Sequence, residues 1–292
     1  MFKSVLLACT ALALSSGALA QGKMLNPDDP NDGMEIMRKL QCGEGDAKPA
    51  LYRWSGHVYS RVPGERDKHL FDIEGMNVRQ CVALNDAKRG KGYRMVSREI
   101  MLYLDPTTHQ IVRDWKNPWT GETVPLFHVA NDPVNGRPSY AFAEDGTPTK
   151  LGATRIGDWL LLPVEVPLFY KNPLAGEYQD YVGNQYHAME IFDFAMPIKE
   201  ALDPRTKSIH GSVSWVRLSK WLPWMKMGDR AGTMVHNAVG TKVHGYEELP
   251  QVLRDEIATN YPAWSAPPPL DDARPNATSW TEIRKKIDAQ KK

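Results

Sequence analysis

The chain has 292 residues, and its 36 lysines and arginines almost balance its 35 aspartates and glutamates, for a formal net charge of +1. This balance argues against a nucleic-acid-binding protein and against one that binds membranes by a basic surface. Hydrophobic residues make up 42% of the sequence. A chain of this size and composition can bury a sizeable core, as one large domain or two smaller ones.

Residues 1–20, MFKSVLLACTALALSSGALA, predict a cleaved signal peptide. Lys3 supplies the positive start, residues 5–14 an apolar stretch, and the small residues ending at Ala20 a cleavage site. The apolar stretch is too short to span a bilayer of about 30 Å, so no membrane span is expected. A lipoprotein signal ending at Cys9 is a disfavoured alternative, because almost no apolar region precedes it. Loss of the peptide takes one basic residue from 36 and leaves 35 of each sign, which predicts a formally neutral periplasmic or secreted protein.

Two cysteines, Cys42 and Cys81, remain after processing. In an oxidising compartment such a pair is more typical of a disulfide than of two thiols, so a Cys42–Cys81 bridge is predicted. Two buried free cysteines are the alternative. The bridge encloses 38 residues, and loop closure of that length contributes about 4 kcal/mol to stability.

The N-terminal part of the mature chain changes from polar to helical and then to strand periodicity. Residues 21–33 predict an extended arm, and a short helix follows, capped by Asp32 and ended by Gly43. Residues 34–262 are expected to form one antiparallel β domain with peripheral helices. Residues 263–292 predict a Pro-rich linker and a terminal helix.

Strand-like segments follow one another with short turns and few helices between them. They occupy residues 51–62, 69–84, 93–105, 111–115, 122–129, 138–143, 153–166, 185–195, 211–218 and 233–243. This succession predicts an all-β, mainly antiparallel fold, because parallel pairing would need crossover helices. So many strands tend to curl or close, so we expect a large curved sheet or a β-barrel, with a two-sheet β-sandwich as the alternative.

The strand at residues 93–105 mixes charged and apolar side chains on both faces. A strand with water on one side alternates cleanly instead. We therefore expect Arg98 or Glu99 to face a partly polar cavity, as a ligand contact or, for Glu99, as an acid–base group. The alternative for each is a cross-strand ion pair on a solvated face.

Other polar side chains interrupt apolar strands in the same way. An inward-pointing Arg79 would need a carboxylate, because a buried charge is costly unless paired. The candidate partners are Glu99, Glu165 and Glu190. The further candidate ligand contacts in apolar strands are Glu190, Trp215 and His236.

The turn DWKNPWTGE carries two indoles. Asn117 starts the turn before Pro118. Trp115 and Trp119 offer large flat surfaces that suit an aromatic wall at a cavity mouth. We list all three as candidate ligand contacts, with hydrophobic plugging of one end of the fold as the alternative.

The segment HVANDPVN is the strongest local candidate for chemistry. His128 ends an apolar strand, and a histidine near a carboxylate such as Asp132 can act as a general base. Asn131 and Asp132 are candidate ligand contacts as well. Asn-Asp-Pro is also ordinary turn chemistry, which favours a structural role for those two residues.

Motif spacing identifies no cofactor and no metal. The eight histidines show no HExxH or HxH spacing, although strands far apart in the sequence could still assemble a metal site. There is no GxSxG, no phosphate-binding loop and no dinucleotide fingerprint. The sequence motifs therefore do not identify a cofactor.

Five long stretches resemble the bacterial and fungal family called domain of unknown function 1838. They are GHVYSRVPGERDKHLFDIEGMNVRQC, GYRMVSREIMLYLDP, DWKNPWTGETVPLFHVANDPVN, GNQYHAMEIFDF and SVSWVRLSKWLPWMKMGDRAG. The resemblance extends over roughly residues 34–262. It implies no reaction, cofactor or catalytic residue set, so no functional residue is transferred from it.

Three functions compete on these observations. The first is an exported enzyme that acts on a small, largely apolar or aromatic molecule, with His128 or Glu99 as acid–base group. The second is a periplasmic carrier that binds such a molecule without chemistry. The third is an envelope interaction protein whose Trp221 and Trp224 contact a partner or lipid. A small-molecule ligand in a cavity is expected for the first two.

Overall fold

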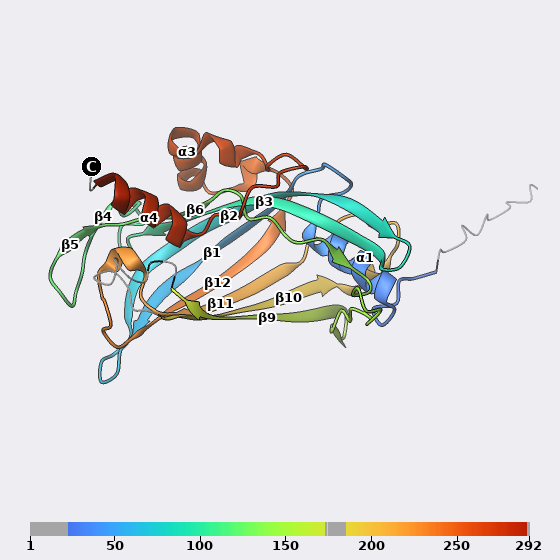
Figure 1. Ribbon diagram of the computed structural model, residues 1–292, viewed down its shortest axis with the longest axis horizontal. Helices are drawn as coiled ribbons and strands as arrows, with labels where there is room; N and C mark the ends of the chain where they lie inside the picture. Colours follow the sequence, from blue (N-terminus) through green and yellow to red (C-terminus); the bar gives the residue numbers. More distant parts are fainter. Residues whose placement is uncertain (1–22, 173, 175–184, 291–292) are drawn as a thin grey trace, which may run out of the picture.

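The computed structural model describes residues 23–172, 174 and 185–290, and its main element is a curved antiparallel sheet of ten strands (Figure 1). The signal peptide expected at residues 1–20 lies outside the described residues. The elements are α1 (Pro30–Gln41), β1 (Ala50–Arg61), β2 (Lys68–Asp86), β3 (Gly90–Leu104), β4 (Asp114–Lys116), β5 (Thr123–Pro125), β6 (Val129–Asn131), β7 (Ser139–Tyr140), β8 (Thr154–Ile156), β9 (Trp159–Lys171), β10 (Gln185–Pro197), α2 (Ile198–Leu202), β11 (Ser212–Ser219), η1 (Pro223–Met225), β12 (Thr233–Val243), η2 (Tyr246–Glu248), α3 (Gln251–Asn260), η3 (Pro262–Ser265) and α4 (Ser279–Gln290).

The strand order in the sheet is β6-β3-β2-β1-β12-β11-β10-β9-β8, with β7 also paired to β3. The separate β4–β5 pair forms a small second sheet. Every pairing is antiparallel, which confirms the predicted fold class. Within the described residues the two terminal strands of the order, β6 and β8, do not pair. The sheet is thus curved but open, and neither the β-barrel nor the β-sandwich is formed.

Side-chain alternation divides the sheet into an inner face and an outer face. The inner face is covered at one end by α1 and at the other by η1, α4 and the β4–β5 pair (Figure 1). At the α1 end Leu40 packs near Leu162, and at the opposite end Trp224 packs on Phe71. The outer face of β2 and β3 is covered by α3, which contributes Leu253 to a cluster with residues of both strands.

The helix α1 begins earlier than expected. Asp29, rather than Asp32, is the N-cap, because its carboxylate accepts the backbone N–H groups of Asn31 and Asp32. Pro30 follows at the first helical position, where its missing N–H costs nothing. The predicted disulfide between Cys42 and Cys81 is present and fastens the end of α1 to β2.

Two buried lysines hold α1 in place through hydrogen bonds to backbone carbonyls. The Lys39 Nζ donates to three carbonyl oxygens around the end of α2, at 2.7–2.9 Å. The Lys242 Nζ on β12 donates to the carbonyls of Lys39 and Cys42 at 2.9 and 2.8 Å. Burial lowers the pKa of Lys39 to about 8 and that of Lys242 to about 7. These lysines cap helix ends and keep the end of the inner face closed.

Among the helices that the structure describes, each is too short or too polar to cross a membrane.

Candidate functional site

The inner face carries a row of charged and polar side chains contributed by six strands, called here the inner-face row. Its members are Asn77 and Arg79 of β2, Glu99 of β3, Asn131 of β6, Glu190 of β10, Trp215 and Arg217 of β11, and His236 of β12. Cross-strand register explains their common face. Asn77 pairs with Glu99, which pairs with Asn131, and Glu190 pairs with Arg217, which pairs with His236.

The half of the row on β2, β3 and β6 contains a carboxylate held by a neutral partner. Asn131 Nδ2 donates to Glu99 Oε1 at 2.6 Å. Arg79 donates its Nε to Asn77 Oδ1 at 2.7 Å and another N–H to Gln41 Oε1. Burial raises the pKa of Glu99, against the opposing effect of the Asn131 hydrogen bond. Burial likewise lowers the pKa of Arg79. Both groups are therefore charges held in an unfavourable environment.

The half on β10, β11 and β12 is built around Arg217. Its Nε lies 3.6 Å from Glu190 Oε1, with 18% and 23% of the two side chains exposed, and its guanidinium donates to the Tyr186 hydroxyl. Burial lowers the pKa of Arg217. The nearby Tyr186 and Glu190 raise it by more, so the net pKa shift is upward. Burial lowers the pKa of His236 to about 3, so this imidazole is neutral. Arg217 and Glu190 also influence the pKa of Glu99, so the two halves of the row lie near each other.

Several polar atoms of this region have no hydrogen-bond partner within the described residues. They are the indole Nε1 of Trp54 and of Trp215, the Nε of Arg217 and the Oδ1 of Asn131. Buried polar atoms are normally bonded, and each unbonded one costs about 1–3 kcal/mol. A set of such atoms on one face indicates partners supplied by water or by a ligand.

Part of the row is reached by solvent, whereas Asn77, Asn131 and His236 are buried. Arg79, Glu99 and Arg217 are densely surrounded by protein atoms, yet each keeps part of its side chain accessible. Trp54 and Trp215 on the same face are also only half-buried. Apolar surface with a few convergent polar groups is the usual form of a small-molecule site.

Two predicted contacts lie on the outer face and are occupied by structural partners. Arg98 Nε is 2.8 Å from Asp132 Oδ1, and Arg98 also donates to the carbonyls of Ala263 and Ala266 at 2.8 Å. Arg274 binds the same aspartate at 2.8 Å. Arg98 and Asp132 thus fasten the C-terminal segment to the sheet, and neither adjoins the row.

The turn with the two indoles packs against one end of the inner face. The side chain of Asn117 is buried; its Oδ1 accepts the N–H of Trp119 and its Nδ2 donates to the Met225 carbonyl at 2.9 Å. Trp115 is 5.6 Å from Trp224, centroid to centroid. These contacts match the plugging alternative for Trp115, Asn117 and Trp119.

The tryptophans of the KWLPWMKM segment lie in the core. Trp221 is 5% exposed and Trp224 is 2% exposed. The Trp221 Nε1 is satisfied by the carbonyl of Arg230 at 2.9 Å. The expectation that these indoles project toward a partner or lipid is wrong, because the hydrophobic cluster at this end of the sheet encloses them.

His128 occupies the sheet edge, away from the expected carboxylate. Its Nδ1 accepts the backbone N–H of Tyr103 at 3.1 Å, and its ring stacks on that of Tyr103. Burial lowers the pKa of His128 to about 4. Asp132, which was expected as its partner, is bound by Arg98 and Arg274.

Sequence reasoning missed Arg217, Trp54 and Tyr186. Arg217 follows Trp215 by two positions in a strand, so alternation alone places it on the same face. Trp54 had an indirect signal in Gly75, which lies mid-strand opposite it. A Cβ on Gly75 would lie 2.3 Å from the Trp54 ring, so only glycine admits the indole there.

Comparisons with known proteins place the chain in a family without assigning an activity. Among curated proteins there is no match. Among solved structures, Ail, the attachment invasion locus protein of Yersinia pestis, matches with 6% identity over 68% of this chain and 99% of that chain. The TM-score of 0.18 is too low to indicate a shared fold. The family model described as "Protein of unknown function (DUF1838)" matches residues 47–287. The chain therefore belongs to the DUF1838 family, as the sequence motifs predicted.

Proposed function

We propose that the inner-face row binds a small organic molecule with an aromatic or apolar body and an anionic or hydrogen-bonding group. The observation that carries the proposal is the set of polar atoms on Trp54, Trp215, Arg217 and Asn131 that have no hydrogen-bond partner within the described residues. A ligand with hydrogen-bonding groups would satisfy atoms that otherwise cost free energy.

The charges of the row favour an anionic group on the ligand. Arg79 and Arg217 face Glu99 and Glu190, and burial shifts the pKa of Glu99 toward its neutral form. A row with two guanidinium groups and a carboxylate biased toward neutrality holds an excess of positive charge. The aromatic body would contact Trp215 and Phe192, whose rings stack at 6.4 Å, centroid to centroid.

A second candidate function is acid–base catalysis on the same ligand. It is favoured by Glu99, which combines a raised pKa with an orienting hydrogen bond from Asn131. A buried carboxyl with a raised pKa is suited to donate or accept a proton. His128 is not proposed for this role, because its Nδ1 is occupied by the Tyr103 N–H.

We further infer export of the protein to an oxidising compartment. The Cys42–Cys81 disulfide is consistent with an extracytoplasmic location, since such bonds rarely persist in a reducing cytosol.

The test is native mass spectrometry of untagged protein purified from the periplasm of its own cells, combined with titration by the anionic aromatic dye 8-anilinonaphthalene-1-sulfonate. We expect a co-purifying small molecule, and one dye site that this molecule displaces. Arg217→Met should weaken dye binding at least about tenfold, whereas Arg53→Met on the outer face should leave it unchanged. A ligand-free protein whose dye binding responds equally to both substitutions would refute the site. Turnover of the co-purified molecule, abolished by Glu99→Gln with its binding retained, would establish catalysis.

A further inference from the structure

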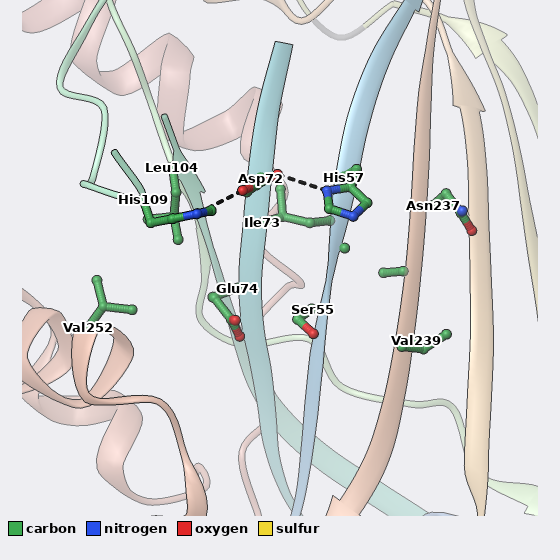
Figure 2. A pocket seen from close by; sticks show the side chains of 12 residues that line it. Ser55, His57, Asp72, Ile73, Glu74, Leu104, His109, Asn237, Val239 and Val252 are labelled. Atoms are coloured by element: carbon green, nitrogen blue, oxygen red, sulfur yellow. Dashed lines mark hydrogen bonds and ion pairs between the residues drawn. The ribbon is translucent and has the colours of Figure 1, made fainter. Parts of the chain in front are cut away.

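The outer face carries an open pocket of about 560 Å³ that none of the predicted site residues lines. Its lining residues are Ser55, Gly56, His57, Asp72, Ile73, Glu74, Leu104, His109, Asn237, Ala238, Val239 and Val252. Figure 2 shows Asp72 at one end of this pocket, with His57 on one side and His109 on the other. A third histidine, His69, reaches the same carboxylate.

The three imidazoles divide the two oxygens of Asp72 between them. His57 Nδ1 lies 2.8 Å and His69 Nε2 lies 2.9 Å from Oδ1. His109 Nδ1 lies 2.9 Å from the other oxygen, Oδ2. The ligand atoms of His57, His69 and Asp72 all lie within 4.8 Å of one another.

Local backbone features create this convergence. His57 and Asp72 are a direct cross-strand pair of β1 and β2. His69 and Asp72 are three residues apart, which in a regular strand places them on opposite faces. The register shift next to Val58 and Tyr59 inserts an extra residue in β2 and brings His69 to the outer face. His109 has a φ of 54°, a left-handed conformation rarely adopted by residues other than glycine.

We propose that His57 Nδ1, His69 Nε2 and Asp72 Oδ1 bind a divalent transition metal, with Zn²⁺ as the best-fitting ion, and that His109 orients the Asp72 carboxylate through Oδ2. Imidazole and carboxylate are ligands that zinc accepts at about 2.0–2.2 Å. Bonds of that length in tetrahedral geometry separate neighbouring ligand atoms by about 3.3 Å. To admit the ion, each nitrogen would move about half an ångström away from Oδ1, and the two nitrogens, which lie within 4.8 Å of each other, would take up a separation of about 3.3 Å.

The site would keep one coordination position for water or a ligand. Three protein ligands and an open fourth position are typical of catalytic rather than structural zinc sites. His57 and Asp72 line the pocket, and Glu74, whose Oε2 is buried without a hydrogen-bond partner within the described residues, lines it as well. His109 Nδ1 lies 2.9 Å from the second oxygen of the ligating carboxylate, and a supporting contact of this kind tunes metal affinity about 10–100-fold.

The test uses untagged mature protein, stripped with EDTA, titrated with ZnCl₂ by isothermal titration calorimetry and analysed for bound metal by mass spectrometry after dialysis. One equivalent of Zn²⁺ is expected. His57→Ala, His69→Ala and Asp72→Asn should each weaken binding at least about 100-fold, and His109→Ala about tenfold. The matched control is His187→Gln, an exposed histidine on β10. Circular dichroism checks that each variant is folded.

Visible absorption of the Co²⁺-loaded protein separates site binding from loose association, because four-coordinate Co²⁺ absorbs far more strongly than hexa-aqua Co²⁺. An intense spectrum that disappears in Asp72→Asn supports the proposal. Absence of stoichiometric binding, or equal loss of affinity in His187→Gln and His57→Ala, overturns it and leaves a hydrogen-bonded histidine cluster.

Discussion

The inner-face row and the outer-face histidine cluster both draw on β2, yet their polar groups are satisfied in opposite ways. In the cluster, Asp72 contacts three histidines whose side chains are 52%, 33% and 69% exposed. In the row, Arg217 and Glu190 approach only to 3.6 Å, and several polar atoms nearby have no partner within the described chain. Within the described residues, the side chains of the cluster contact one another, whereas several polar atoms of the row have no hydrogen-bond partner.

The polar side chains of the row lower the stability of the fold more than those of the cluster do. A charge removed from water is costly unless paired and hydrogen-bonded, and the fold could have placed apolar side chains on the inner face at no such cost. Retained charges without close partners on a covered face are the reason why we propose a ligand for the row. The cluster suggests a metal site through its geometry, because two nitrogens and one oxygen lie within 4.8 Å of one another.

The largest effect on this comparison is expected from Arg217→Met. Removing the guanidinium leaves Glu190 as an uncompensated, mostly buried charge, and breaking such a pair costs about 3–5 kcal/mol. In the outer-face pair Arg53–Glu74, at 3.9 Å, the arginine is 38% exposed, against 18% for Arg217, so Arg53→Met should cost less than Arg217→Met. Urea unfolding measures both. The double variant Glu190→Gln/Arg217→Met should recover much of the loss; equal losses in the two single variants would contradict the distinction.

Loss of the disulfide should lower the stability of the protein nearly as much, and of the two sites it should affect only the inner-face row. Replacing Cys42 and Cys81 together by alanine removes a loop closure worth about 4 kcal/mol. Because the bond holds the end of α1 over the inner face, dye binding should weaken along with stability. Zinc binding by the folded fraction should persist, since the cluster lies on the other face. Loss of both activities in fully folded protein would show that the two regions are coupled.

Strand periodicity predicted the sheet because it needs only local information. Alternation and turns place Glu99 and Trp215 in strands, and a long succession of hairpins implies antiparallel pairing. The pairing of β1 with β12 and of β6 with β3 depends on contacts between distant segments. That pairing decides which candidates meet, so the sequence suggested Glu99, Asn131 and Glu190 separately and gave no reason to join them.

The histidine cluster escaped prediction for a different reason. Alternation assigns His69 and Asp72 to opposite faces, and only the bulge in β2 reverses that assignment. His128 misled in the other direction, because an apolar strand ending in a histidine suggests chemistry, whereas its ring accepts the backbone N–H of Tyr103. Register shifts and side chain–backbone bonds are not visible in residue spacing.

The buried His236 of the inner face should make the protein less stable at acid pH. Its pKa is about 3 in the folded state because of burial, against about 6.5 when unfolded. The unfolded chain therefore binds the proton first, and stability falls as the pH drops from about 6.5 toward 3, by up to about 1.4 kcal/mol per pH unit. His236→Leu should flatten this acid limb in urea unfolding measured across pH. An unchanged acid limb in His236→Leu would refute the assignment.

The smallest expected effect is a stability change of opposite sign for two carboxylates on opposite sides of the sheet. Burial raises the pKa of Glu99, so its contribution to stability is present below about pH 4.5 and is lost as the pH rises through the folded pKa. The hydrogen bond from Arg113 lowers the pKa of Glu256 on α3, so that contribution is present above about pH 4.5 and is lost as the pH falls. Near neutral pH, Glu99→Gln should therefore stabilise the protein and Glu256→Gln should destabilise it. Each change in slope is bounded by about 1.4 kcal/mol per pH unit. Destabilisation by Glu99→Gln at neutral pH would mean that the carboxylate is already compensated, and that the row needs no ligand at that position.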